Sequence, residues 1–232
     1  MSSGILTIDD IASKNTPAIV DFLCEKNIRA IMFAVGQNVE KHYDEALYAL
    51  KNGMIVGNHS YSHPEFSRLT AEQCAEEIEK NERVLEKLYA DAGVKREYKV
   101  FRFPYGDKGG DNKEFIQKYL KENGFIKVQD TQITYPWWKE NGLDKDIDTY
   151  WTFDFCEYMI RPGSEFNFDC VMDRIHNNDP EQGVPLFKAG SRHLLLLHAH
   201  DETEEMVPDY YKLFINELLK NGFEFEKPAF LK

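Results

Sequence analysis

The chain has 232 residues, of which 42% are hydrophobic and 29% are charged, and it carries a formal net charge of −12. This length and composition predict one globular domain over residues 1–232. The acidic balance argues against nucleic acid as a partner, because nucleic-acid recognition usually needs a basic surface. No apolar run is long enough to span a bilayer, so no membrane span is expected.

The start of the chain and its cysteines bear on where the protein works. The first apolar run follows Met1 almost at once, without the basic and apolar segments of a signal peptide. The cysteines lack a C-x-x-C spacing and are expected to be buried free thiols: Cys24, Cys74, Cys156 and Cys170. Both features predict a cytoplasmic location. A signal peptide removed from a longer precursor would instead place the protein outside the cell or in its envelope.

Strands and helices alternate from the N-terminus. The apolar spacing predicts a strand over 4–8, and Thr16 followed by Pro17 predicts the start of a helix. An unbroken apolar run over 30–35 predicts a strand that is covered on both faces. The next expected elements are a helix over 39–50, a strand over 54–56, a helix between Thr70 and Gly93, and a strand over 99–103.

The second half continues the pattern. Its expected elements are helices over 115–120, 168–175 and 206–218 and strands over 125–128, 149–155, 193–197 and 223–225. Residues 130–147 are the least regular part. There, Trp137 and Trp138 would either offer a surface for stacking sugar rings or pin a loop by aromatic burial. The alternation predicts one α/β domain of β-α units, in the form of a barrel.

Two histidines four residues apart are the first candidate for chemistry. His59 and His63 follow a short apolar run, and a helical turn would point both imidazoles to one side. The adjacent carboxylates of Asp9 and Asp10 end another apolar run. Two imidazoles and one carboxylate are typical of a catalytic metal site with open positions. Each pair alone has a simpler explanation, which is a surface turn for the histidines and a helix cap for the aspartates.

Several polar residues are expected to meet at one rim. If the strands are parallel neighbours, their carboxyl ends lie at the same face of the barrel, where active sites form. The residues placed there are Asp9, Asp10, His59, Arg102, Asp154 and His198. Taken singly, Arg102 could be in a surface ion pair and His198 could be a core histidine.

Four motifs resemble those of a known family, in the same order along the chain. They are Thr7–Asp10, His59–His63, Arg102–Gly106 and Leu196–His198. This order resembles the polysaccharide deacetylases, also called the NodB homology domain or carbohydrate esterase family 4. The resemblance implies a distorted (β/α) barrel. It also implies a hydrolase that removes N-acetyl groups from an amino-sugar oligo- or polysaccharide of the chitooligosaccharide or peptidoglycan type.

The same resemblance implies a role for each motif residue. One divalent metal ion, zinc first and cobalt or nickel as alternatives, would be held by Asp10, His59 and His63. Asp9 would be the base for a water molecule activated by the metal, and Arg102 would hold Asp9. His198 would be the acid, and the backbone N–H of Tyr105 would face the oxyanion. Leu196 would line the acetate pocket, with Pro104 and Trp151 also contacting substrate.

The chain departs from the family pattern at two places. Ile11 follows the aspartate pair where the family usually has glycine. Residues 154–158 replace the usual Asp-x-x-Asp-Trp, so Glu157 is expected to orient His198 and Tyr158 to form an aromatic wall. His193 and His200 are expected to be structural, because only His198 matches the motif.

Two other functions remain open from the sequence. The same site could act on O-acetyl xylan or on a non-sugar amide. Alternatively, the chain could be a catalytically weak relative that binds carbohydrate.

Overall fold

A parallel sheet forms the centre of the computed structural model, which describes residues 1–181 and 183–231. The strand order is β3-β2-β1-β5-β4, and β6 also pairs with β1. All these pairings are parallel. The strands are β1 (Ser3–Ile11), β2 (Ile31–Ala34), β3 (Ile55–Asn58), β4 (Phe153–Asp154), β5 (Arg192–His198) and β6 (Glu224–Phe225).

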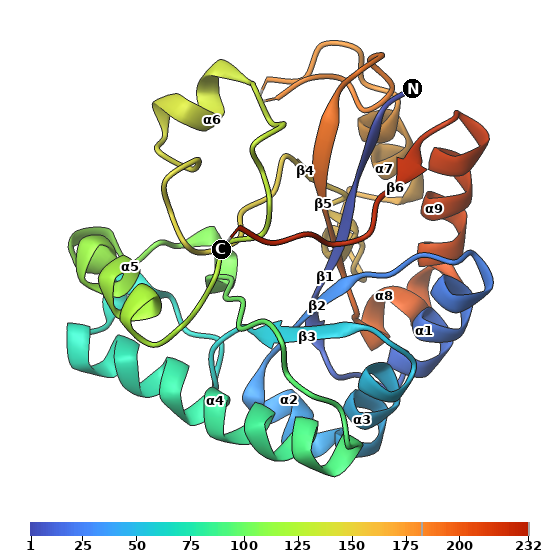
Figure 1. Cartoon of the computed structure of the whole chain (residues 1–232). Coiled ribbons are helices and arrows are strands. Elements are labelled where there is room, and N and C mark those ends of the chain that lie inside the picture. Colours follow the sequence, from blue (N-terminus) through green and yellow to red (C-terminus); the bar gives the residue numbers. More distant parts are fainter. Residues whose placement is uncertain (182, 232) are drawn as a thin grey trace.

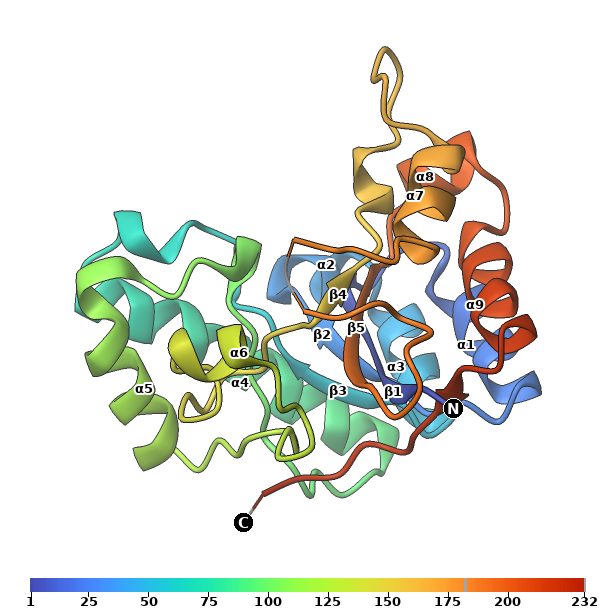
Figure 2. The same cartoon turned by 90° about the horizontal axis from the view of Figure 1, so that it is seen from above.

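Helices cover the sheet from two sides. In both Figure 1 and Figure 2, α4, α5 and α6 gather on one side of the strands and α1, α7, α8 and α9 on the other. The helices are α1 (Thr16–Glu25), α2 (Gly36–Lys41), α3 (Tyr43–Lys51), α4 (Ala71–Ala92), α5 (Lys113–Glu122), α6 (Pro136–Glu140), α7 (Phe168–Ile175), α8 (Asp201–Met206) and α9 (Tyr210–Lys220). No helix in the described part of the chain is both long enough and apolar enough to cross a bilayer.

Alternate residues of the central strands enter two different apolar clusters. Leu6 and Ile8 of β1 pack with α1 and α9, whereas Ile5 faces the opposite cluster with Phe33 and Leu194. Burial on both faces explains why these strands read as unbroken apolar runs. A third cluster of aromatic and aliphatic side chains lies between α4 and α5.

The expected strands over 99–103 and 125–128 are present only as isolated bridges, at Asn58↔Phe101 and Lys99↔Phe125. Single backbone hydrogen bonds still extend the sheet. The Asn58 N–H donates to the Val100 carbonyl, the Arg102 N–H to the Asn58 carbonyl, and the Thr149 N–H to the Phe101 carbonyl. Pro104 has no N–H to continue a ladder. The parallel strand pairings confirm the α/β fold. The chain segment from β3 to β4, which the structure describes throughout, contains isolated bridges and no regular strand.

Three smaller expectations also need correction. The helix over 39–50 is two helices, because the backbone of His42 leaves the helical region at φ −125° and ψ 54°. The strand over 149–155 shortens to β4. All four cysteines are free as expected, but Cys24 is exposed, and only Cys74 is buried.

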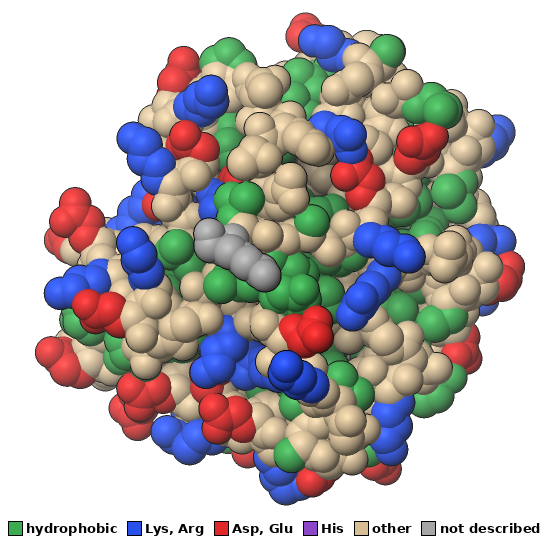
Figure 3. Space-filling view, in the orientation of Figure 1, with side chains coloured by type: hydrophobic (Ala, Val, Ile, Leu, Met, Phe, Trp, Pro, Cys, Tyr) green, Lys and Arg blue, Asp and Glu red, His purple; other side chains and the backbone are tan. Residues whose placement is uncertain are grey.

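The face seen in Figure 3 carries interspersed acidic and basic side chains, and no histidine is visible on it. Because β1 and β5 are parallel and in register from Ser3↔Arg192 to Asp9↔His198, Asp9 and His198 lie side by side at one edge of the sheet.

Candidate active site

A cavity of about 380 Å³ lies at the carboxyl edge of the sheet. Asp9 and Asp10 come from the end of β1, His59 follows β3, and His198 ends β5. These side chains and His63 all line the cavity. The parallel topology thus brings together residues that lie far apart in the sequence, as the strand assignments predicted.

A β-bulge turns both carboxylates of the aspartate pair toward this cavity. Neighbouring residues of a regular strand point to opposite faces. Here the register between β1 and β2 shifts between Ile8 and Ile11, and Asp10 has a φ of 63°. An extra residue on one strand re-aims the side chains that follow it. Asn38 secures the bulge, since its side-chain N–H donates to the Asp10 carbonyl over 2.9 Å.

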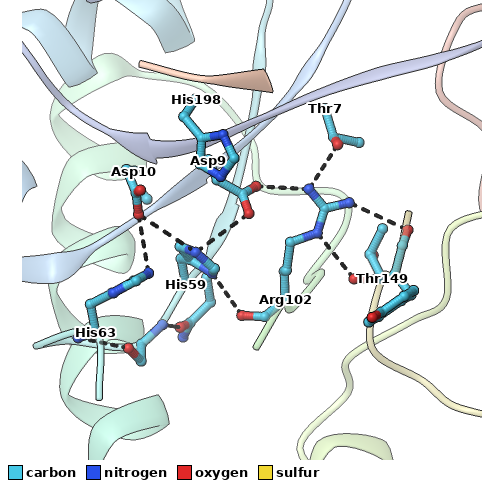
Figure 4. Close-up of polar contacts among 12 residues, drawn as sticks. Thr7, Asp9, Asp10, His59, His63, Arg102, Thr149 and His198 are labelled. Carbon is cyan, nitrogen blue, oxygen red and sulfur yellow. Dashed lines mark hydrogen bonds and ion pairs between the residues drawn. The ribbon is translucent and has the colours of Figure 1, made fainter. Parts of the chain in front are cut away.

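Asp10, His59 and His63 present one donor atom each within 4.8 Å of one another. Asp10 Oδ1 lies 3.2 Å from His63 Nε2 and 3.6 Å from His59 Nε2 (Figure 4). Ligands that each lie about 2.0–2.2 Å from one zinc ion in a tetrahedron are roughly 3.3–3.6 Å apart. The donor set and its spacing therefore fit one divalent ion.

The two imidazoles converge from a loop and not from the helical turn that the spacing suggested. Ser60 and His63 both have left-handed φ values, 63° and 59°. The His63 N–H donates to Ser60 Oγ over 3.0 Å, which closes the loop. His59 Nδ1 lies 2.9 Å from the Arg102 carbonyl, so Nδ1 carries the proton and Nε2 is left to face Asp10.

A buried polar network supports this loop from below. Asn58 Oδ1 accepts from the Ser60 N–H over 2.8 Å, and Asn58 Nδ2 donates to Glu82 over 2.9 Å. The two terminal guanidinium nitrogens of Arg96 donate to the two oxygens of Glu82 over 2.8 and 2.9 Å. Burial opposes ionisation of Glu82, but Arg96 holds the pKa of this carboxyl below its usual range.

Arg102 is fully buried and holds Asp9 from the side away from the histidines (Figure 4). Its Nη1 donates to Asp9 Oδ1 over 2.8 Å and to Thr7 Oγ1 over 2.7 Å. Its Nε donates to the Thr149 carbonyl over 3.1 Å. Asp9 Oδ2 is left 3.4 Å from His59 Nε2, within the cavity.

Glu157 holds His198 on the opposite side of the cavity. One oxygen of the fully buried Glu157 accepts from the His198 backbone N–H over 2.6 Å and lies 3.1 Å from His198 Nδ1. Burial opposes protonation of this imidazole, but the Glu157 charge and hydrogen bond together raise the pKa of His198 to about 10. Nε2 is the ring nitrogen left for the cavity.

Burial and neighbouring charges shift the other titrating groups too. Burial opposes ionisation of Asp10, yet its hydrogen bond with His200 and the nearby His59 and His63 hold the pKa of Asp10 well below its usual range. Burial and the His59 charge lower the pKa of His63 to about 4. Both shifts favour the ionised carboxylate and the neutral imidazole that a metal requires.

Aromatic and aliphatic side chains form the cavity walls. Tyr158 meets the His198 ring edge-on at 4.7 Å, and Tyr105 meets the His63 ring at 4.5 Å. Leu196 is buried at the floor. Trp151 lies so close to Gly106 that a Cβ there would be 2.6 Å from the indole, so glycine is needed at that position.

Comparison with known proteins decides which family carries these motifs. The sequence model described as polysaccharide deacetylase matches residues 2–125, more than half of the chain. The chain belongs to the polysaccharide deacetylase family. Because the match ends at residue 125, the extension of the family domain over residues 126–232 stays a prediction.

Curated relatives from bacteria and fungi are similar to parts of the chain. A peptidoglycan-N-acetylglucosamine deacetylase of Bacillus cereus is 32% identical over 148 residues, which are 62% of this chain and 48% of that protein. Chitin deacetylase 1 of Cryptococcus neoformans is 33% identical over 102 residues, which are 44% of this chain and 21% of that protein. The chain thus spans about half, or less, of the length of these relatives.

Solved structures share the fold at low sequence identity. The family 4 carbohydrate esterase of Streptomyces lividans, solved with acetate, has a TM-score of 0.61 at 21% identity and covers 95% of this chain and 90% of that one. A family 4 pseudoenzyme of Bacillus anthracis has a TM-score of 0.63 at 20% identity, with 96% and 63% covered. Since a pseudoenzyme shares it, the fold of this deacetylase family does not by itself show activity.

Some residues of the family motifs do not line the cavity. Pro104 is buried and is not among the residues that line the cavity, so its contact with substrate stays a prediction. Arg102 and Glu157 are fully buried and contact Asp9 and His198, respectively. Ile11 is buried in the core cluster, where an apolar side chain replaces the usual glycine of the family.

Three cavity residues were not assigned a role from the family motifs. Asp154 and Arg161 line the cavity, and His200 Nε2 lies 2.7 Å from Asp10 Oδ2. His200 therefore lies at the candidate site, which the motif comparison did not indicate. The signal was in the sequence, because His198 and His200 are two residues apart at the end of a strand and so lie on the same side. His193, by contrast, is buried against Thr152 as expected.

The two neighbouring tryptophans have different environments. Trp138 is buried and its Nε1 donates to Asp130 over 3.0 Å, which supports aromatic pinning of the loop. Trp137 is half-buried and lines a second cavity that also borders Trp151 and Asp154.

Proposed function

We propose that this protein is a metal-dependent hydrolase that removes N-acetyl groups from an amino-sugar oligo- or polysaccharide of the chitooligosaccharide or peptidoglycan type. Family membership and the names of the curated relatives support the substrate class. One observation carries the proposal. A candidate metal-binding triad, a carboxylate held by arginine and a histidine held by glutamate surround a single cavity.

Asp10, His59 and His63 would hold the ion, with zinc first and cobalt or nickel as alternatives. When bound there, a divalent ion supplies a Lewis acid for the acetamido carbonyl and lowers the pKa of water. The three residues suit this task because they leave coordination positions open to the cavity, as catalytic sites require.

Asp9 would take the proton from the attacking water. The carboxylate is within the cavity beside the metal-binding triad, and Arg102 fixes Oδ1 so that Oδ2 is the oxygen left to accept a proton. A positioned base of this kind contributes about 100- to 10,000-fold to the rate.

His198 would deliver a proton to the leaving amine nitrogen. An amine leaves poorly from a tetrahedral centre unless it is protonated. Glu157 holds Nδ1, so Nε2 would carry the proton that is transferred. With its pKa raised to about 10, His198 carries this proton across neutral pH.

The cavity walls would orient the sugar. The backbone N–H of Tyr105 would donate to the developing oxyanion, as preorganised donors do in acyl transfer. Leu196 would contact the acetyl methyl group, and Tyr158 and Trp151 would pack against the sugar ring.

Acetate release tests this proposal. Purified protein with zinc is expected to release acetate from acetylated chitooligosaccharides and to lose this activity with a chelator. Acetylxylan serves as the comparison substrate, because a bifunctional xylanase/deacetylase of Pseudobutyrivibrio xylanivorans is 32% identical over 101 residues. Acetate release from acetylxylan alone would mean that the substrate carries an O-acetyl ester and not an N-acetyl amide. Sugar binding without release from any substrate would make the chain a binding relative.

A further inference from the structure

The two carboxylate oxygens of Asp10 face different histidines. Oδ1 faces His59 and His63, the other members of the candidate metal-binding triad. Oδ2 lies 2.7 Å from Nε2 of His200, a distance typical of a charge-assisted hydrogen bond. The contact of Oδ2 with His200 is a hydrogen bond, so the carboxylate has a fixed partner outside the candidate metal-binding triad.

The backbone around His200 is tied to the loop that carries Asp10. The Ala199 N–H donates to the Asp9 carbonyl over 3.0 Å. On the other side, Asp201 accepts from the backbone N–H of Asn15 over 3.0 Å. These hydrogen bonds join the ends of β1 and β5 to each other. They therefore fix the position of the His200 imidazole relative to Asp10.

His200 also shields the outer oxygen of Asp10. Asp10 and His200 line the cavity of about 380 Å³ and also, together with His63, a second cavity of about 470 Å³. The side chains are 16% and 30% exposed. Without the imidazole, Oδ2 would face water in the second cavity, and the carboxylate could rotate away from His59 and His63.

We propose that His200 is a positioning residue for the metal centre, fixing the Asp10 carboxylate so that Oδ1 alone is directed at the ion. This inference rests on the proposed function only in that Asp10, His59 and His63 bind a divalent ion. His200 acts through Asp10 and not as a ligand. In the described residues, the group of potential metal-binding atoms that includes Asp10 contains His59 and His63 but not His200, and the other such group consists of Asp154, Glu157 and His198. Loss of such a hydrogen-bond partner typically weakens metal affinity by about 10- to 100-fold.

Zinc affinity measured by calorimetry on metal-free protein tests this role without relying on turnover. His200→Ala is expected to bind zinc about 10- to 100-fold more weakly than the wild type. His200→Gln is expected to recover most of the affinity, because its amide N–H reaches a position similar to that of Nε2. His176→Ala is the matched control, because His176 is exposed and bonds only to Glu217 among the described side chains.

Three outcomes would overturn the proposal. Equal zinc affinity in the wild type and His200→Ala would overturn this inference alone. X-ray absorption spectra of the zinc-bound wild type that require three imidazoles would make His200 a ligand instead. Failure of the wild type to bind zinc would overturn both this inference and the proposed metal dependence. Unchanged melting temperatures of the metal-free variants are expected, and they separate metal positioning from a loss of folding.

Discussion

The carboxylates of Asp9 and Asp10 reach one cavity because β1 bulges at that point. A regular strand would have sent one of them to the opposite face. The bulge therefore permits two adjacent residues to take different tasks. Asp9 is bonded to Arg102 and Asp10 to His200, so each carboxylate has its own fixed partner.

Replacement of Asp9 by asparagine separates these tasks. Asp9→Asn retains the shape of the side chain but removes the group that accepts a proton. We expect turnover to fall by about 100- to 10,000-fold, while zinc content, measured by elemental analysis, stays at the wild-type level. Normal turnover in this variant would exclude Asp9 as the base, and loss of zinc would mean that it is a ligand.

The pH profile tests the pairing of His198 with Glu157. Burial works against protonation of His198, but Glu157, Asp10 and Asp154 raise its pKa to about 10. The acid form is present below this value and is lost as pH rises through it. Glu157→Gln removes the closest negative charge, so the alkaline limb of kcat/KM should move to lower pH. If the alkaline limb of kcat/KM does not move in this variant, a group other than His198 determines it.

At the scale of elements, α4 anchors the histidine loop through Glu82. The side chain of Glu82 is 11% exposed and bonds to Arg96, Lys99 and Asn58, and Asn58 in turn holds the Ser60 N–H. A buried ion pair that loses one partner leaves an uncompensated charge. This helix consequently supports the loop geometry as well as the core.

Glu82→Ala should therefore be strongly destabilising. We expect the free energy of unfolding, measured by urea titration, to fall by about 3–5 kcal/mol. Glu86→Ala, one turn further along α4 with a side chain 63% exposed, is the control and should change it by no more than about 0.5 kcal/mol. Similar losses in both variants would remove the special role of Glu82.

The elements also show how far the sequence predicts the structure. Periodicity and caps predicted the central strands and α4, whose Thr70–Gln73 capping box is present. They did not predict the loss of the strands over 99–103 and 125–128, because the aromatic side chains there pack into a core without needing a ladder. The site residues could be placed at one rim by strand ends alone. The bulge at Asp10 and the hydrogen bond from His200 depend on tertiary contacts.

At the scale of the whole molecule, metal binding should stabilise the fold. The triad joins β1 to the loop after β3, so an ion that binds only the folded state adds to stability. At a zinc concentration 100 times Kd the gain is about 2.7 kcal/mol, which corresponds to a rise in Tm of roughly 5–10 °C for a chain of this size. His59→Ala should fold and show no such rise. An equal rise in that variant would place the zinc elsewhere.

The central claim is that Asp10, His59 and His63 bind one divalent ion at the carboxyl edge of the sheet. Anomalous diffraction from a zinc-soaked crystal tests it most directly. The predicted result is a single strong peak about 2.0–2.2 Å from Asp10 Oδ1, His59 Nε2 and His63 Nε2. No peak there, or a peak bound by other residues, would contradict it.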